Sequence, residues 1–176
     1  MCLMCDITGR DYYHNHSGNN SAPIKTRDNN NSEKTLNFND GNNIIVLDNH
    51  NTTFRGLAGD DVYIISQKTV NKDAKIEIID TNGNNIIQLV ENLKITKSLF
   101  TSDATRLTLE NGSVITINGA DKFTFELSGN VTTGTQGTEK TFEEFAKFMG
   151  IDALPISGTK NGTDNITITI NDKVTV

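Results

Sequence analysis

The 176-residue sequence lacks the features of several large classes of protein. It contains no run of about 18 apolar residues, which a membrane-spanning helix needs. Its 16 lysines and arginines are scattered and are outnumbered by 22 aspartates and glutamates, giving a net charge of -6. The start of the chain also lacks the basic opening and apolar core of a general secretory signal. We therefore expect no membrane span and no nucleic-acid partner.

The signatures of common enzymes are missing as well. The histidines are His14, His16 and His50, so the helical H-E-x-x-H zinc signature is absent. Neither the G-x-S-x-G nucleophile elbow nor a G-x-x-x-x-G-K-[ST] phosphate loop occurs. Glu143 and Glu144 are adjacent, and adjacent residues on a helix do not face each other, so they cannot share acid and base roles. The sequence therefore predicts a protein that is not an enzyme.

Short β-branched runs such as IIVL, VYII, IEII and ITITI hold most of the apolar residues, and Asn and Thr are common between them. Such runs separated by turn-forming residues are typical of strands, so a mostly β fold is expected. The stretch LTLENGSVITI predicts a hairpin with a two-residue turn at Asn111 and Gly112. The strands are expected near residues 43–47, 53–55, 62–66, 75–80, 85–90, 105–110, 113–118, 122–127 and 165–170.

One helix is expected near residues 141–149, in the stretch TFEEFAKFMG. Thr141 and Glu144 form a capping box, and Gly150 supplies a C-terminal stop. We expect this helix to cap one end of the β structure and to protect its edge. Its buried face is predicted, from helical spacing, to comprise Phe142, Phe145, Ala146 and Met149.

A short pattern recurs before four of the apolar runs: Gly, any residue, Asp or Asn, any residue, and a large apolar residue. The first two copies are eighteen residues apart, which is two nonapeptides. A fixed period predicts stacked turns, with alternate turns on the same edge and the apolar residues Ile45, Phe54 and Tyr63 forming an inward ladder. The copies are Gly41-Asn43-Ile45, Gly59-Asp61-Tyr63, Gly83-Asn85-Ile87 and Gly162-Asp164-Ile166.

This spacing suits calcium. Glycine permits the positive φ of a tight turn and brings backbone carbonyls close together, and a carboxylate from the same turn adds charge. Two stacked turns therefore offer oxygen ligands to a hard cation, with Asp61 and Asn43 facing one ion beside carbonyls near Gly59 and Gly41. Ordinary turn chemistry is the alternative interpretation, and it is favoured at Asn85. The candidate calcium residues are Asn43, Gly59, Asp60, Asp61, Asn85 and Asp164.

The nonapeptide GLAGDDVYI differs from G-G-x-G-x-D-x-U-x only where Leu57 replaces the second glycine. It resembles one repeat of the RTX (repeats-in-toxin) calcium-binding proteins, over about residues 38–66. The stretches DKFTFELSGN and TEKTFEEFAKFMGI are similar to regions of large secreted RTX-containing bacterial surface proteins, S-layer-type ones included. The sequence departs from the pattern with Asn at 43 and 85 and with a step of twenty-four residues between Gly59 and Gly83, which breaks the nine-residue register.

The resemblance implies a short calcium-binding parallel β-roll that continues into a β-sheet or solenoid domain with one capping helix. It also implies a secreted or cell-surface location, reached through type I secretion machinery. We expect a flexible arm over residues 1–35, the β domain over 36–157, and C-terminal strands over 158–176 that begin a further roll. The expected function is a calcium-stabilised structural or adhesive module whose partners are other surface or secreted chains, including its own copies.

Two Cys and two His stand close together near the N-terminus. Cys2, Cys5, His14 and His16 supply four ligands, the number for tetrahedral zinc. The two pairs are close in sequence and the histidines are separated by one residue, so a disulfide or two free thiols are favoured over a zinc site. The opening MCLMC resembles the start of some serralysin-like RTX zinc proteases. That resemblance implies an alternative function, an accessory or processed segment of a secreted RTX zinc metalloprotease with a Cys/His metal site.

Overall fold

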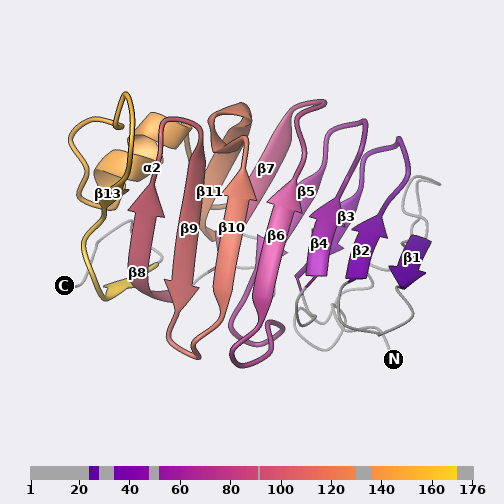
Figure 1. The fold of residues 1–176 in the computed structure, drawn as a ribbon, viewed down its shortest axis with the longest axis horizontal. Coiled ribbons are helices and arrows are strands. Elements are labelled where there is room, and N and C mark those ends of the chain that lie inside the picture. The colour runs from indigo at the N-terminus through magenta and orange to yellow at the C-terminus, as the bar shows by residue number, and fades with distance from the viewer. Residues whose placement is uncertain (1–23, 28–33, 48–51, 91, 130–135, 170–176) are drawn as a thin grey trace.

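Two β-sheets face each other in the computed structural model, which describes residues 24–27, 34–47, 52–90, 92–129 and 136–169 (Figure 1). The larger sheet has the order β1 (Ile24–Arg27), β2 (Lys34–Asn37), β4 (Thr52–Arg55), β6 (Lys75–Ile79), β10 (Val114–Asn118), β9 (Ala104–Leu109), β8 (Lys94–Phe100) and β13 (Lys160–Asn161); β14 (Ile166–Thr167) also pairs with β8. The smaller sheet has the order β12 (Thr138–Lys140), β11 (Phe123–Gly129), β7 (Asn85–Val90), β5 (Val62–Ile65) and β3 (Ile44–Val46). The expected mostly β fold is confirmed.

Consecutive strands alternate between the two sheets from β2 to β7. Each sheet contains four neighbouring strands that pair in parallel. They are β2, β4, β6 and β10 in the larger sheet and β3, β5, β7 and β11 in the smaller sheet. The chain crosses from the larger to the smaller sheet at one edge, the upper edge in Figure 1, and returns at the opposite edge. The upper-edge turns are residues 38–43, 56–61 and 80–84, and they lie side by side because their flanking strands pair in parallel.

The predicted inward ladder is buried, but it comes from both sheets. Ile45 lies opposite Tyr63, and Tyr63 lies opposite Ile87, all in the smaller sheet. Phe54 faces them from the larger sheet, where it lies between Leu36 and Ile78. Ile45, Phe54 and Tyr63 are each no more than 1% exposed. A shift of one residue would turn these side chains outward, so their burial fixes the register.

The step of twenty-four residues between Gly59 and Gly83 leaves the stacking intact. Val62 still pairs with Ile86, and Tyr63 with Ile87. The additional residues lie in the loop 66–74 between β5 and β6, at the edge opposite the glycine turns. A longer loop there changes the period of the sequence without displacing the stacked turns.

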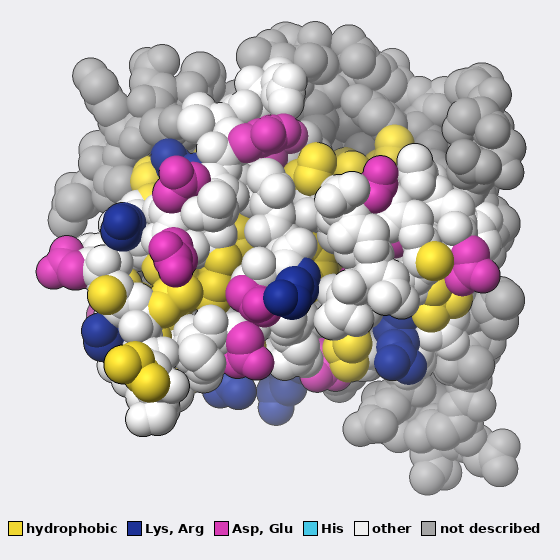
Figure 2. Space-filling view, turned by 90° about the horizontal axis from the view of Figure 1, so that it is seen from above, with side chains coloured by type: hydrophobic (Ala, Val, Ile, Leu, Met, Phe, Trp, Pro, Cys, Tyr) yellow, Lys and Arg dark blue, Asp and Glu magenta, His cyan; other side chains and the backbone are white. Residues whose placement is uncertain are grey.

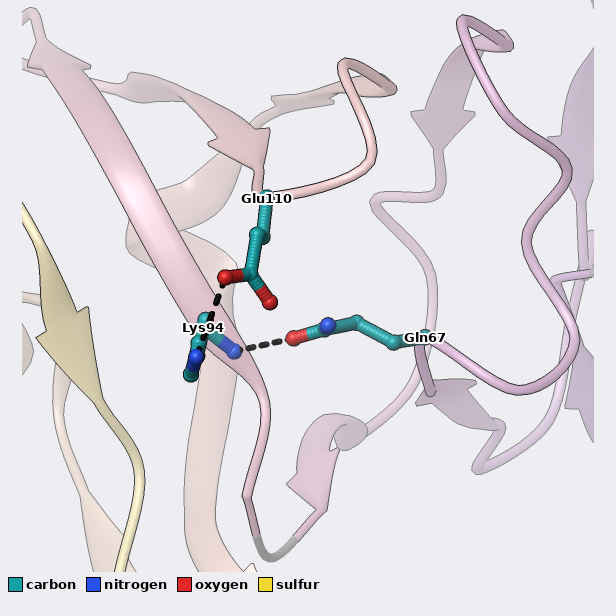
Figure 3. Close-up of polar contacts among 3 residues, drawn as sticks. All are labelled: Gln67, Lys94 and Glu110. Carbon is teal, nitrogen blue, oxygen red and sulfur yellow. Dashed lines mark hydrogen bonds and ion pairs between the residues drawn. The ribbon is translucent and has the colours of Figure 1, made fainter.

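An antiparallel pair, β8 and β9, extends the larger sheet and separates β7 from β10 in the sequence. Its open end is tied to the loop 66–74 (Figure 3). The backbone N–H of Lys94 donates to Gln67 Oε1, and the Lys94 ammonium lies 3.0 Å from Glu110 Oε1. Both charged side chains are about half exposed, so the ion pair itself contributes less than about 1 kcal/mol. The contact mainly fixes where the hairpin meets the loop.

The predicted hairpin at Asn111 and Gly112 is confirmed, but its loop is longer than expected. Leu109 N–H donates to Ser113 O at 2.8 Å, so three residues, 110–112, lie inside the closing pair. Gly112 has φ of 83°, which suits the left-handed position of a three-residue hairpin loop. The prediction of a two-residue turn was wrong because Glu110 leaves the strand.

The predicted helix is confirmed as α2 (Phe142–Phe148), the α-helix of the described ranges. Thr141 and Glu144 form the expected capping box. Its apolar face is fully buried, and Phe145 stacks on Phe125 with ring centroids 4.4 Å apart. Among the described residues, no helix is long and apolar enough to cross a membrane. β1 falls within the expected flexible arm, so residues 24–27 of that arm are paired.

Candidate metal centre

Three Gly-x-Asx turns of the upper edge are stacked, each hydrogen-bonded to the next through its inner Asx residue. The backbone N–H of Asn43 donates to Asp61 Oδ1 at 2.7 Å. The backbone N–H of Asp61 donates in turn to Asn85 Oδ1 at 2.8 Å. All three residues are at least 98% buried. Each side-chain oxygen therefore satisfies a buried backbone donor of the preceding turn, which fixes the spacing between turns.

A second ladder runs along the outside of the same turns in the opposite direction. The backbone N–H of Asp60 donates to Asn42 Oδ1, and that of Asn84 donates to Asp60 Oδ1, both at 2.8 Å. These residues are exposed. Figure 2 views the molecule from above and shows white polar side chains and backbone over much of this face, with acidic, basic and hydrophobic side chains among them. The short Asn and Asp side chains are suited to this role because they reach neighbouring backbone groups.

The glycines allow the turns to approach. Gly59 and Gly83 have φ of 104° and 94°, in the region that favours glycine. A Cβ on Gly59 would lie 2.7 Å from the carbonyl oxygen of Gly41, and a Cβ on Gly83 would collide with the carbonyl oxygen of Gly59. The sequence pattern thus requires glycine for conformation and for contact between backbones.

The structure brings five of the six predicted calcium residues together in this stack: Asn43, Gly59, Asp60, Asp61 and Asn85. Asp164 lies elsewhere, exposed in a bend before β14, which pairs with β8 at the far side of the larger sheet. The amide of Asn43 is directed toward its own turn, since its nitrogen donates to Asn39 Oδ1 at 2.7 Å and to Gly41 O at 2.8 Å. Asp61 is therefore the stacked residue with a carboxylate directed inward.

A second buried carboxylate, from Asp80, lies beside Asp61. The two residues are 0% and 3% exposed, and the Asp80 carboxylate acts directly on that of Asp61. A Cβ on Gly56 would collide with Asp61 Oδ2 and would lie 2.5 Å from Asp80 Oδ2, so glycine leaves the space in which the two oxygens meet. Tyr63 lies on the other side: its hydroxyl donates to Asp80 Oδ2 and accepts from Gly56 N–H, both at 2.7 Å.

Sequence reasoning missed Asp80 because it is not the Asx of a Gly-x-Asx pattern. Asp80 is three residues before Gly83, and in the preceding turn the equivalent position, three residues before Gly59, is Gly56. The available signal was an aspartate that directly follows the apolar run IEII, at the end of a buried strand. An acidic side chain at that point enters the end of the space between the sheets.

The environment of the pair changes the acidity of both side chains that touch Asp80. The pKa of the Asp61 carboxyl is raised to about 7, by burial first and also by Asp80 and Asp60, although the Asn43 N–H lowers it. Burial and the hydrogen bond to Asp80 also raise the pKa of the Tyr63 hydroxyl. The Asp61 carboxyl is therefore harder to ionise than an ordinary aspartate, and it needs a proton or a cation to offset its charge.

The other predicted metal residues cannot be placed. Cys2, Cys5, His14 and His16 lie outside the described residues. Within the described ranges, no three His, Cys, Asp or Glu side chains form a cluster that could hold a metal. An ion at Asp61 would therefore draw on backbone, hydroxyl or water oxygens in addition to carboxylates, as calcium commonly does.

Comparison with protein-family models, with curated proteins and with solved structures found no match for this chain.

Proposed function

We propose that this chain is a calcium-stabilised structural or adhesive module of a secreted or cell-surface bacterial protein and that it is not an enzyme. The stack of Gly-x-Asx turns around Asp61 carries the proposal. It places a buried carboxylate between backbone-rich glycine turns, which is the kind of oxygen-donor setting that a hard cation prefers.

The strand arrangement supports the finer assignment of the fold as a short parallel β-roll that continues into a larger β domain. Strands β2 to β7 alternate between sheets, and their parallel neighbours are separated by one turn of the chain. In such a roll each turn contacts only its neighbours, so an ion that bridges two turns stabilises the stack directly. Helix α2 covers the end of the core beyond β11 and acts as the cap of this roll.

Calcium then couples folding to location. A chain that folds fully only with calcium stays open for export through type I secretion machinery where calcium is scarce. Extracellular modules often bind calcium with dissociation constants of about 0.1–1 mM, which suits closure outside the cell. The folded module would present its surface to other secreted or surface chains, copies of itself included.

The test is thermal unfolding in chelator and in calcium. At 10 mM free calcium, a dissociation constant of about 0.1–1 mM gives about 1.4–2.7 kcal/mol of stabilisation, or a rise in Tm of about 3–10 °C. Magnesium at equal ionic strength should give a smaller rise, since it demands stricter octahedral geometry. We expect Asp61→Asn, which keeps an acceptor for Asn43 N–H, to lose the rise.

The matched control is Asp152→Asn, which removes an exposed carboxylate from the bend after α2. This variant should respond to calcium as the wild type does. If the wild type melts at the same temperature in chelator and in calcium, the Gly-x-Asx turns are stabilised by their own hydrogen bonds alone. That result would contradict the proposed function.

A further inference from the structure

The second oxygen of Asp61 is left without a hydrogen-bond donor. Asp61 is 0% exposed, and Oδ1 accepts from Asn43 N–H, but Oδ2 has no donor among the described residues. A buried carboxylate oxygen without a donor or a cation is costly, because burial removes the water that would otherwise solvate it. Oδ2 is therefore the atom of the stack that most needs a positive partner.

The neighbours of that oxygen increase the need. The charged groups that raise the pKa of Asp61 are the carboxylates of Asp80 and Asp60. Tyr63 contributes a neutral hydroxyl, since its proton is held toward Asp80. Two buried carboxylates in contact require either a shared proton or a cation between them.

We propose that the calcium ion of this module is held between Asp61 Oδ2 and the carboxylate of Asp80, which makes Asp80 a calcium ligand. This inference rests on the proposed function and names the site within it. Asp80 takes the place that the sequence pattern gives to Asn43. The ion lies at the inner side of the turn stack, between the turn 56–61 and the end of β6.

The local geometry suits this site better than the one predicted from the sequence. Asn43 uses its amide within its own turn, whereas Asp80 is directed to the same point as Asp61 Oδ2. Tyr63 positions Asp80 through a 2.7 Å hydrogen bond to Oδ2. A side chain at Gly56 would displace Asp61 Oδ2 and Asp80 Oδ2, so glycine keeps these two oxygens together, and carboxylate oxygens are ligands that a hard cation prefers.

The first experiment measures the calcium-induced rise in Tm for Asp80→Asn, Asp152→Asn and the wild type. Asn at position 80 keeps the size of the side chain and removes a like charge, so this variant should melt in chelator at or above the wild-type temperature. We expect its calcium affinity to fall by about tenfold or more, because the number of charged ligands sets calcium affinity. Asp152→Asn removes an exposed carboxylate outside the turn stack and should keep the wild-type response.

The outcomes separate this inference from the function on which it rests. A wild-type response that persists unchanged in Asp80→Asn would overturn the inference and leave the proposed function standing, with the ion held by the turns alone. No response in the wild type would overturn both. Loss of the response in Asp80→Asn, with Asp152→Asn unaffected, would support the site.

A second experiment locates the ion with terbium, which replaces calcium at oxygen sites and emits when an adjacent excited tyrosine transfers energy to it. The chain has three tyrosines and no tryptophan, so Tyr63 is the sensitiser expected at this site. Tyrosine-sensitised emission that calcium displaces and that Tyr63→Phe abolishes would place the ion beside Asp80. Emission of wild-type intensity in Tyr63→Phe would place the ion elsewhere and contradict the inference.

Discussion

Asp61 has two different roles through its two carboxylate oxygens. Oδ1 accepts from the backbone of the preceding turn and so fixes the spacing of the stack, while Oδ2 meets the carboxylate of Asp80. The first role needs only an acceptor, which Asn fulfils in the neighbouring turn at position 85. The second role depends on charge. If position 61 only had to accept the Asn43 N–H, Asn would be sufficient there. The presence of Asp at position 61 therefore indicates that its negative charge has a function.

The protonation of Asp61 gives a prediction for the calcium-free protein. Its pKa in the folded state, about 7, lies above the ordinary value of 3.8, because of burial first and then of Asp80 and Asp60. The folded state therefore binds this proton more tightly than the unfolded state. Its contribution to stability is fully present below about pH 3.8 and is lost as the pH rises through about 7.

Asp61→Asn isolates this effect, because Asn copies the protonated carboxyl and does not titrate. In chelator, the Tm of the variant minus that of the wild type should grow as the pH rises from about 5 to about 8. Over that range only the wild type comes to hold a charged Asp61 beside Asp80 and Asp60. Calorimetry at several pH values measures the difference. A difference that does not change with pH would show that Asp61 stays charged, or stays neutral, across the range.

The sequence predicts the turn residues at this scale better than it predicts their neighbours. Gly59, Asp61 and Asn85 recur in a local pattern, and local spacing determines how they meet. Asp80 and Gly56 are not next to each other in any short pattern; parallel pairing of β4 with β6 brings them together. Contacts that depend on which strands pair cannot be derived from the residues of one strand.

At the scale of elements, α2 shows how a local signal is completed by packing. The capping box and the apolar spacing define the helix from the sequence. Its place is fixed by aromatic contacts: Phe145 stacks on Phe125 and also packs against Phe100, with ring centroids 5.8 Å apart. Stacked and tilted aromatic pairs of this kind add about 0.5–1.5 kcal/mol beyond the area they bury.

We expect Phe145→Ala to lower the free energy of unfolding by about 3–5 kcal/mol, because it leaves a cavity between α2 and both sheets. Phe148→Ala is the matched control: the same helix loses the same side chain at a partly buried position. Its cost should be clearly smaller. Urea unfolding followed by circular dichroism measures both. Equal losses would mean that the helix does not depend on the contact of Phe145 with Phe125.

The strands differ in how far the sequence predicts them. β5 and β7 follow turn signals and carry β-branched runs, so their positions are close to those expected. β8 was missed because it reads Lys-Ile-Thr-Lys-Ser-Leu-Phe and a register shift between Ile95 and Lys97 interrupts its alternation. β12 is short and mostly exposed. Polar edge-like strands are stabilised by their partners, and those partners are distant in the sequence.

At the scale of the whole molecule, one apolar cluster joins the stacked turns to the helix end. The same buried cluster includes Leu36 near the first turns, Tyr63 beside Asp80, Phe145 on α2 and Ile168 after β14. Its continuity results from the alternation of strands between sheets, which places inward residues from distant segments in one layer. The predicted division into an arm, a domain over 36–157 and further strands over 158–176 can be tested through this cluster.

A continuous core predicts a single cooperative unfolding transition for the described ranges. With Tyr12 and Tyr13 replaced by Phe, tyrosine fluorescence reports the turn stack through Tyr63. Far-ultraviolet circular dichroism reports all strands and the helix, so the two melts should coincide in calcium and in chelator. Phe145→Ala should lower both midpoints by the same amount, although position 145 lies at the far end of the core from the turns. Separate transitions, with the tyrosine signal moved by calcium alone and the dichroism signal moved by Phe145→Ala alone, would divide the molecule into two folding units. In that case calcium would stabilise the stack of turns without reaching the helix end.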